Sequence, residues 1–270
     1  MVFSGQNFSM FAAILLLPTS LIAQSEIKTD SPHFGEKGWD FELGIGALTF
    51  SDSIYKDDDV DGNSGVLPLI NISYFDDNFH FILDREDGLL LGYTVYRQKD
   101  WAADIILSPR FEGPEDDNDT LDFLDERDPD LHAGLRWSFY GTDSRLKLEA
   151  SKDISGAHNG YIVSTEYQQE WQVRNWLLTG RAGISYLSAK GVDYYLGVNS
   201  SEATVEFPSY EADAEFIYGV GIKAEYPINE NWVFEATAGT GYLGSEITNS
   251  PISSGENQIT GATIGAIYHF

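Results

Sequence analysis

The stretch Gln258-Ile-Thr-Gly-Ala-Thr-Ile-Gly-Ala-Ile-Tyr-His-Phe270 closes the chain on an aromatic residue and decides the expected fold. Successive side chains of a β-strand point to opposite faces, so alternate residues share a face. One set is apolar and ends on two aromatic rings: Thr260, Ala262, Ile264, Ala266, Tyr268 and Phe270. The other set is small and mixed: Ile259, Gly261, Thr263, Gly265, Ile267 and His269. An apolar band edged by aromatic residues is typical of a transmembrane barrel strand, although an ordinary edge strand also fits this segment alone.

Eleven further segments alternate in the same way and are separated by turn-rich stretches. They run over residues 39–47, 66–75, 79–83, 89–95, 101–107, 131–139, 146–150, 161–167, 176–186, 216–226 and 232–238. With the closing segment the total is twelve, and single-chain bacterial barrels have an even number of strands. No uninterrupted apolar run reaches the roughly 18 residues of a membrane-spanning helix.

The connections between these segments alternate in length. The short ones are 75–78, 97–100, 141–144, 170–175 and 227–231, and the longer ones are 51–64, 112–130, 152–160, 188–213 and 245–257. The connection 84–88 is a short exception among the longer set. Short periplasmic turns and longer outer loops are a property of outer-membrane barrels, whereas a soluble β-sandwich has no reason to alternate. The sequence therefore predicts an all-β fold, a transmembrane antiparallel up-and-down β-barrel of 12 strands.

Composition narrows the possible chemistry. The chain has no Cys, so disulfides and thiolate metal sites are excluded. Its formal net charge of −27 opposes binding to nucleic acid and to a bare anionic membrane surface. Divalent cations are more suitable partners for the acidic loops at 51–64 and 112–130.

The amino-terminal segment has the features of a secretory signal. An apolar run from Met10 to Ala23 precedes Gln24, and Leu21-Ile-Ala23 fits a small-residue cleavage site. No Lys or Arg precedes the apolar run, which departs from the usual signal. We expect residues 1–23 to be a signal peptide and residues 24–270 to form the barrel. The protein would then cross the periplasm to the outer membrane of a Gram-negative cell.

Two clusters of residues are candidates for chemical sites. His158 lies in one loop with Asp153 and Ser155, but no third orienting group is placed, and a structural loop motif fits better than a hydrolase. Asp57-Asp-Asp-Val-Asp-Gly62 matches half of a calcium loop, but Pro68 stands where a bidentate Glu is needed. A solvated acidic loop is preferred to a weak Ca²⁺ site. We therefore predict no catalytic, cofactor-binding or metal-ligating residues, and no enzymatic activity.

The inward-facing positions carry charges of both signs. They are Arg110, Arg136, Lys147, Arg181 and Lys223 with Asp40, Glu42, Asp104, Glu149, Glu166, Glu225 and Glu235. His132 and His269 are also expected to face inward, as ordinary lumen histidines. A twelve-strand barrel lies between the filled eight-strand and the open sixteen-strand types. These charges would either pair across the lumen and close it or line a narrow pore, and the sequence leaves both open.

Four short motifs resemble the MipA/OmpV family of outer-membrane proteins. They are Leu124-Asp-Glu-Arg-Asp128 before Ala133-Gly-Leu135, Asp153-Ile-Ser-Gly156 with Gly160, Asp193-Tyr-Tyr-Leu-Gly-Val198, and Asn249-Ser-Pro-Ile252 before the closing strand. They follow the order of the family over nearly all of the mature chain. The uncharged signal region and the strongly acidic loops depart from it.

This resemblance implies a non-enzymatic scaffold that joins a murein lytic transglycosylase to a murein polymerase, in contact with outer-membrane lipids. MipA denotes an MltA-interacting protein, whereas OmpV-type members are linked to adhesion or solute response. A narrow solute channel and a surface adhesin or receptor therefore stay as alternatives. The murein role rests on the resemblance and not on spacing or composition.

Overall fold

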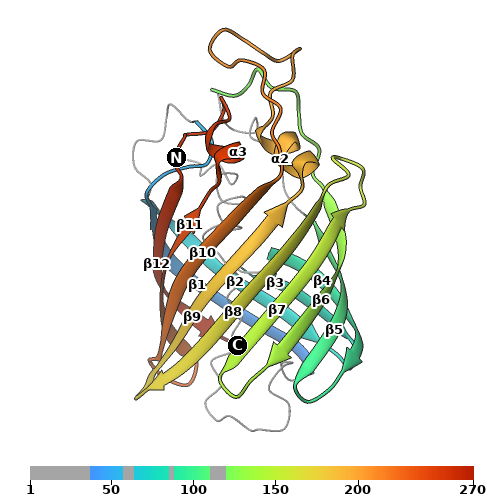
Figure 1. The fold of residues 1–270 in the computed structure, drawn as a ribbon. Helices are drawn as coiled ribbons and strands as arrows, with labels where there is room; N and C mark the ends of the chain where they lie inside the picture. Colours follow the sequence, from blue (N-terminus) through green and yellow to red (C-terminus); the bar gives the residue numbers. More distant parts are fainter. Residues whose placement is uncertain (1–36, 57–63, 85–87, 110–119) are drawn as a thin grey trace.

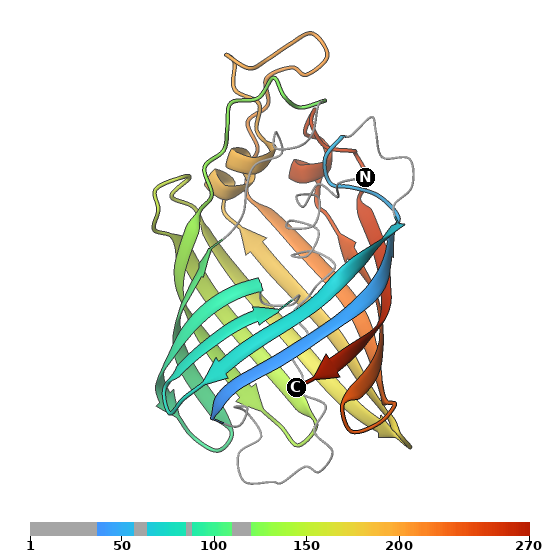
Figure 2. The ribbon, with the colours of Figure 1, turned by 180° about the vertical axis from the view of Figure 1, so that it is seen from behind.

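The computed structural model describes residues 37–56, 64–84, 88–109 and 120–270, which form a closed antiparallel barrel of twelve strands (Figures 1 and 2). The strands are β1 Gly38–Phe50, β2 Ser64–Phe75, β3 Phe79–Asp84, β4 Gly88–Arg97, β5 Trp101–Pro109, β6 Leu131–Tyr140, β7 Ser144–Asp153, β8 Tyr161–Val173, β9 Trp176–Leu187, β10 Glu215–Pro227, β11 Trp232–Tyr242 and β12 Gln258–His269. The predicted fold class is confirmed. The expected signal peptide, residues 1–23, lies outside the described residues.

Closure comes from pairing between the first and last strands, as the terminal stretch predicted. Leu43 lies opposite Tyr268, and Ile45 lies opposite Ala266. Ile264 is 54% exposed on the outer wall, whereas Ile267 is 4% exposed on the inner face. Closure leaves no unpaired sheet edge, which a hydrocarbon environment requires.

Aromatic rings gather at both ends of the outer wall. At the end that carries the short turns, Trp39 packs on Tyr74 with ring centroids 5.0 Å apart, and Trp176 packs on Tyr226 at the same distance. Further rings meet at the opposite end, where the centroids of Tyr218 and Tyr242 are 5.1 Å apart. Amphipathic rings favour the boundary between lipid and water, so two such belts mark the two membrane interfaces.

The short turns lie at the same end as both ends of the barrel sequence, and the longer connections lie at the other end (Figure 1). We therefore assign the turn end to the periplasm. One turn is shorter than expected, because β8 continues to Val173 and only two residues separate it from β9. The register between β4 and β5 shifts between Thr94 and Tyr96, and this bulge leaves both Val95 and Tyr96 exposed.

The outer connections are folded against one another. We use the name outer cap for residues 51–56, 120–130, 188–214 and 243–257. Their buried apolar side chains form one core with Ile259 of β12: Ile54, Tyr55, Leu121, Leu124, Val192, Leu196, Val198, Phe207, Ala212, Leu243, Ile247 and Ile252. Hydrogen bonds tie the segments together, including Ser250 Oγ to the Leu196 carbonyl at 2.6 Å.

The longest connection was expected to be irregular, yet it contains helix α2, Ala189–Leu196. Val192 and Leu196 stand four residues apart, so they share the helix face that enters the cap core. The helix ends at Gly197, whose N–H donates to the Asp193 carbonyl at 2.8 Å. A single turn, α3 (Ser245–Thr248), lies beside it (Figure 1). Neither helix of the described chain has the length and apolarity needed to cross a membrane.

Candidate functional site

The hairpin of β6 and β7 brings together residues that are distant in sequence. Its register places His132 opposite Asp153 at the outer end of the two strands. Asp130 stands just before β6, on the same side as His132, because the two residues are two positions apart. The loop that follows β7 then folds back over this end and carries His158.

Asp153 shapes that loop. Its Oδ1 accepts hydrogen bonds from the Ser155 hydroxyl and backbone N–H at 2.6 and 2.8 Å. Its Oδ2 accepts from the backbone N–H groups of His158 and Asn159 at 2.9 and 2.7 Å. Asp153 and Ser155 therefore organise the loop backbone, and the His158 ring bonds elsewhere. The Ser155 hydroxyl bonds Asp153 and not His158, as in a structural loop motif.

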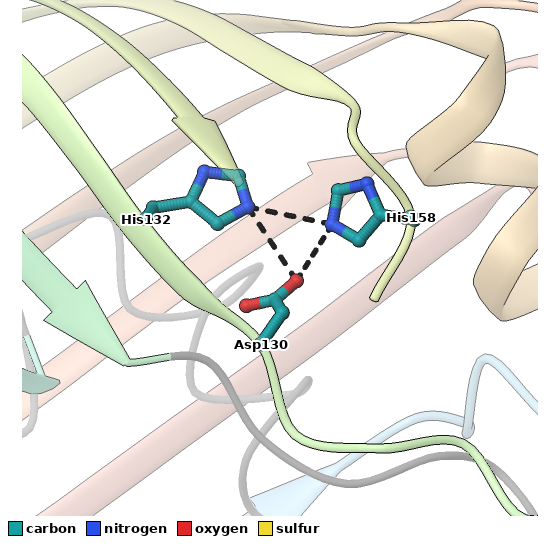
Figure 3. Close-up of side chains that lie close together, drawn as sticks. All are labelled: Asp130, His132 and His158. Atoms are coloured by element: carbon teal, nitrogen blue, oxygen red, sulfur yellow. Dashed lines mark hydrogen bonds and ion pairs between the residues drawn. The ribbon is translucent and has the colours of Figure 1, made fainter. Parts of the chain in front are cut away.

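The His158 ring instead meets Asp130 and His132 (Figure 3). Asp130 Oδ2 lies 2.7 Å from His158 Nε2 and 3.4 Å from His132 Nε2. The two Nε2 atoms are 3.4 Å apart. The three side chains are between 0% and 3% exposed. Two imidazoles and a carboxylate thus converge on one buried point.

Neighbouring groups fix the orientation of this cluster. His132 Nδ1 lies 3.2 Å from Ser151 Oγ, and the Tyr195 hydroxyl donates to Asp130 Oδ2 at 2.8 Å. Burial alone would raise the pKa of the Asp130 carboxyl, but the adjacent His132 and His158 rings and the hydrogen bond from Tyr195 outweigh it and hold that pKa well below its ordinary value. Asp130 is therefore a carboxylate at neutral pH. Its second oxygen, Oδ1, is buried and has no hydrogen-bond partner among the described residues.

The sequence did not point to this cluster, although one signal was present. Asp130 and His132 flank the start of a strand on one face, and hairpin pairing of 131–140 with 144–153 brings the following loop over that start. That pairing brings His158 into contact with His132 and Asp130, which stand 26 and 28 positions earlier in the chain. His132 was expected to be an ordinary lumen histidine, but two of its partners, Asp130 and His158, lie in the outer connections.

The charges expected to face inward are arranged along the barrel wall. Arg136 bonds Glu149 at 2.9 Å and Lys147 approaches Glu166 at 3.6 Å, each pair joining neighbouring strands. Lys223 and Glu225 are 3.0 Å apart on one strand. His269 Nδ1 lies 3.1 Å from Glu42 Oε1, which confirms it as a paired lumen histidine. These pairs follow the wall and do not cross the lumen.

Two expectations fall on residues that the structure does not describe. The half calcium loop Asp57–Gly62 lies in the undescribed range 57–63, and Arg110 lies in the range 110–119. Both stay as sequence-based predictions.

The sequence is similar to those of several outer-membrane proteins. Omp26La of Vibrio anguillarum and OmpV of Vibrio cholerae are each 29% identical over 265 residues, covering 96% of both chains. YiaT of Escherichia coli K12, named a putative outer membrane protein, is 29% identical and covers 82% of this chain and 89% of its own.

Among solved structures, the NanC porin aligns over 84% of this chain and 98% of its own, with a TM-score of 0.46 and 9% identity. An outer-membrane channel from Pseudomonas putida F1 aligns over 91% of this chain with a TM-score of 0.43 and 10% identity. Similarity at this level carries no inference about transport. The profile described as "MltA-interacting protein MipA", in contrast, matches residues 43–270, which is most of the barrel. The chain is an outer-membrane β-barrel protein of the MipA family.

Proposed function

We propose that this protein is a non-enzymatic scaffold that joins a murein lytic transglycosylase to a murein polymerase at the inner side of the outer membrane. Membership of a family described by its interaction with MltA is the observation that carries this proposal. The resemblance found in the sequence supplies the polymerase as a second partner. The proposal expects residues 1–23 to be removed and residues 24–270 to form the barrel.

The periplasmic end offers the surface that such partners would meet. It consists of the short turns between β2 and β3, β4 and β5, β6 and β7, β8 and β9, and β10 and β11. Lys99 and Arg174 are exposed there, next to acidic residues such as Asp100 and Glu230. Turns fixed by strand pairing on both sides present these charges in constant positions, which favours recognition without conformational change.

A narrow solute channel is the second candidate. The observation that favours it is the polar lumen, where ion pairs such as Arg136–Glu149 join neighbouring strands along the wall. The packed outer cap opposes it, because its loops form a common core at the mouth of the barrel. Capture of the murein enzymes and measurement of ion conductance distinguish the scaffold from the channel.

The decisive experiment captures the tagged protein from detergent-solubilised envelopes and measures the amount of lytic transglycosylase and murein polymerase recovered. We expect both enzymes to be enriched, and expect Lys99→Glu to reduce their recovery. Lys190→Glu is the matched control, because it makes the same charge change on the exposed surface of α2 at the opposite end. Equal recovery of the two enzymes with the wild type, Lys99→Glu and Lys190→Glu would argue against the periplasmic turns as the binding surface.

Planar-bilayer recordings provide the complementary test. The scaffold proposal expects no stable conductance steps from the purified barrel. Reproducible single-channel steps, together with failure to capture either murein enzyme, would replace the scaffold with the channel.

A further inference from the structure

The Asp130, His132 and His158 cluster has the composition and spacing of a metal-binding site. Each residue directs one ligand atom into a common space, and all three ligand atoms lie within 4.8 Å of one another. Imidazole nitrogen and carboxylate oxygen are the donors that zinc and related divalent transition metals use in proteins. Hard cations such as Ca²⁺ would instead need six or more oxygen ligands, which this cluster does not supply.

The distances fit a small ion. The ligand atoms form a triangle with sides of 3.4, 3.4 and 2.7 Å. A circle through its corners has a radius of about 1.9 Å, slightly shorter than the roughly 2.0–2.1 Å of a zinc–imidazole bond. An ion just outside the plane of the triangle would therefore reach all three atoms at bonding distance. Figure 3 shows both rings presenting Nε2 to the Asp130 oxygen.

Features beyond the three ligands support occupation by a cation. Asp130 Oδ1 is buried without a hydrogen-bond partner among the described residues, although buried carboxylate oxygens are normally satisfied. A cation beside Asp130 would compensate that buried charge. Ser151 Oγ lies at 3.2 Å from His132 Nδ1 and can accept its proton, which leaves Nε2 as the free lone pair. Metal-bound histidines are commonly held by a partner of this kind.

One hydrogen bond competes with metal binding. The backbone N–H of Gly160 donates to His158 Nδ1 at 2.8 Å, so the proton of the neutral ring resides on Nε2 and points to Asp130. A neutral imidazole bound to metal through Nε2 carries its proton on Nδ1 instead. The metal would thus replace the Nε2 proton, and Gly160 would lose its acceptor. Binding accordingly includes a small rearrangement of the loop 158–160.

From these contacts we propose that Asp130, His132 and His158 form a binding site for one zinc-class divalent ion, with a water completing a tetrahedral shell. The site joins three parts of the outer surface: the segment before β6, the start of β6, and the loop after β7. Tyr195 of α2 also bonds Asp130, so the ion would link the barrel rim to the outer cap. This inference concerns the outer end and is independent of the murein partners.

The test uses the full barrel refolded in detergent after removal of any histidine tag. Competition with a chromophoric chelator measures zinc stoichiometry and affinity. Cobalt substitution then reports geometry, because tetrahedral nitrogen and oxygen coordination gives intense visible d–d bands. We expect one high-affinity zinc per chain and the tetrahedral cobalt spectrum. Because the chain has no Cys, thiolate bands cannot contribute.

Paired variants locate the ion. Asp130→Asn is compared with Asp128→Asn, a neighbouring exposed position, and His132→Asn with His80→Asn, a buried histidine of β3. The cluster variants should lose high-affinity zinc, and the two controls should keep it. Ser151→Ala keeps all three ligands and should weaken zinc binding by about 10–100-fold. Heat-modifiable migration checks that each barrel has folded.

Three outcomes would overturn the proposal. The wild type binds no zinc tightly, the cobalt spectrum is the pale one of six oxygen ligands, or the cluster variants bind zinc as the wild type does. The last result would place zinc on the surface carboxylates. The first two measurements need only the wild-type protein, so a variant that fails to fold leaves the test intact.

Discussion

Arg127 and Glu202 form a buried ion pair across the outer cap, with 2.6 Å between Nη1 and Oε1 and 75 positions between them in the chain. Their side chains are 6% and 2% exposed. Arg127 also donates through Nε to the Tyr194 carbonyl at 3.0 Å. The pair therefore connects the segment before β6 to the longest outer connection.

Loss of one partner should open the cap while the barrel stays closed. Arg127→Ala leaves Glu202 buried and uncompensated, which we expect to cost about 3–5 kcal/mol in the opening free energy of the cap. Hydrogen exchange of residues 188–214 measures that free energy, and heat-modifiable migration monitors the barrel. Lys190→Ala, at an exposed position, should change neither. Unchanged exchange in Arg127→Ala would mean that the cap is held by its apolar core alone.

The same pair predicts a pH dependence. Burial raises the pKa of Glu202, but bonds from Arg127 and from the backbone N–H groups of Asp125 and Asn199 outweigh it and lower that pKa below its ordinary value. The stabilisation is complete above the unfolded pKa of about 4.3 and is lost as pH falls through the lower folded value. The difference in cap opening between wild type and Glu202→Gln should thus be constant near neutrality and shrink below about pH 4. A constant difference down to pH 2 would contradict this.

Neighbouring positions on β9 should differ in their tolerance of charge. Ala182 is exposed on the outer wall between Tyr167 and Val220, whereas Gly183 lies on the lumen side. Ala182→Arg should destabilise the folded barrel by about 2–4 kcal/mol near the membrane centre, and Gly183→Arg should escape the lipid penalty. Denaturant titration in liposomes measures both, with the two Ser substitutions as small polar controls. Equal responses on both faces would refute the assigned orientation.

The carboxy-terminal residue should matter for assembly more than for stability. Phe270 is 76% exposed and contacts Tyr268 with ring centroids 4.9 Å apart, so little buried area depends on it. Deleting Phe270 should lower the amount of folded barrel in cells and leave refolding of the purified chain unchanged. Phe79→Ala, an exposed aromatic at the same end, is the control. Normal cellular yield after the deletion would show that the terminal aromatic is not a recognition signal.

Strand number, faces and closure were predictable because they depend on a period of two. Alternate residues such as Ile264 and Ile267 indicate which face of a strand points outward and which points inward. Short turns between consecutive strands imply that neighbours are antiparallel. The bulge between Thr94 and Tyr96 was not predictable, because both exposed residues there are apolar and fit either register. Strand ends near Val173 were missed for a similar reason, since polar Gln and Glu residues continue the strand beyond the lipid.

The outer cap and the cluster of Asp130, His132 and His158 were harder to predict because both depend on contacts between loops. Val192 and Leu196 have helical spacing, but a helix of eight residues that contains Gly191 has too few apolar positions to give a clear helical pattern. Asp130 and His158 come from different connections and meet only after the β6–β7 hairpin has formed. Local pattern specifies a strand, whereas a site between loops requires the three-dimensional arrangement of several strands.

The shared core of the outer cap restricts how this surface can change. Because Ile54, Leu121, Val192 and Ile252 pack together, an insertion in one loop displaces the support of the others. Antibodies or phage that approach from outside would encounter a composite face to which the four described segments of the outer cap contribute together. Escape through a single loop would then require compensating substitutions elsewhere. For epitope display, transfer of the whole cap onto another barrel should succeed where the grafting of one loop fails.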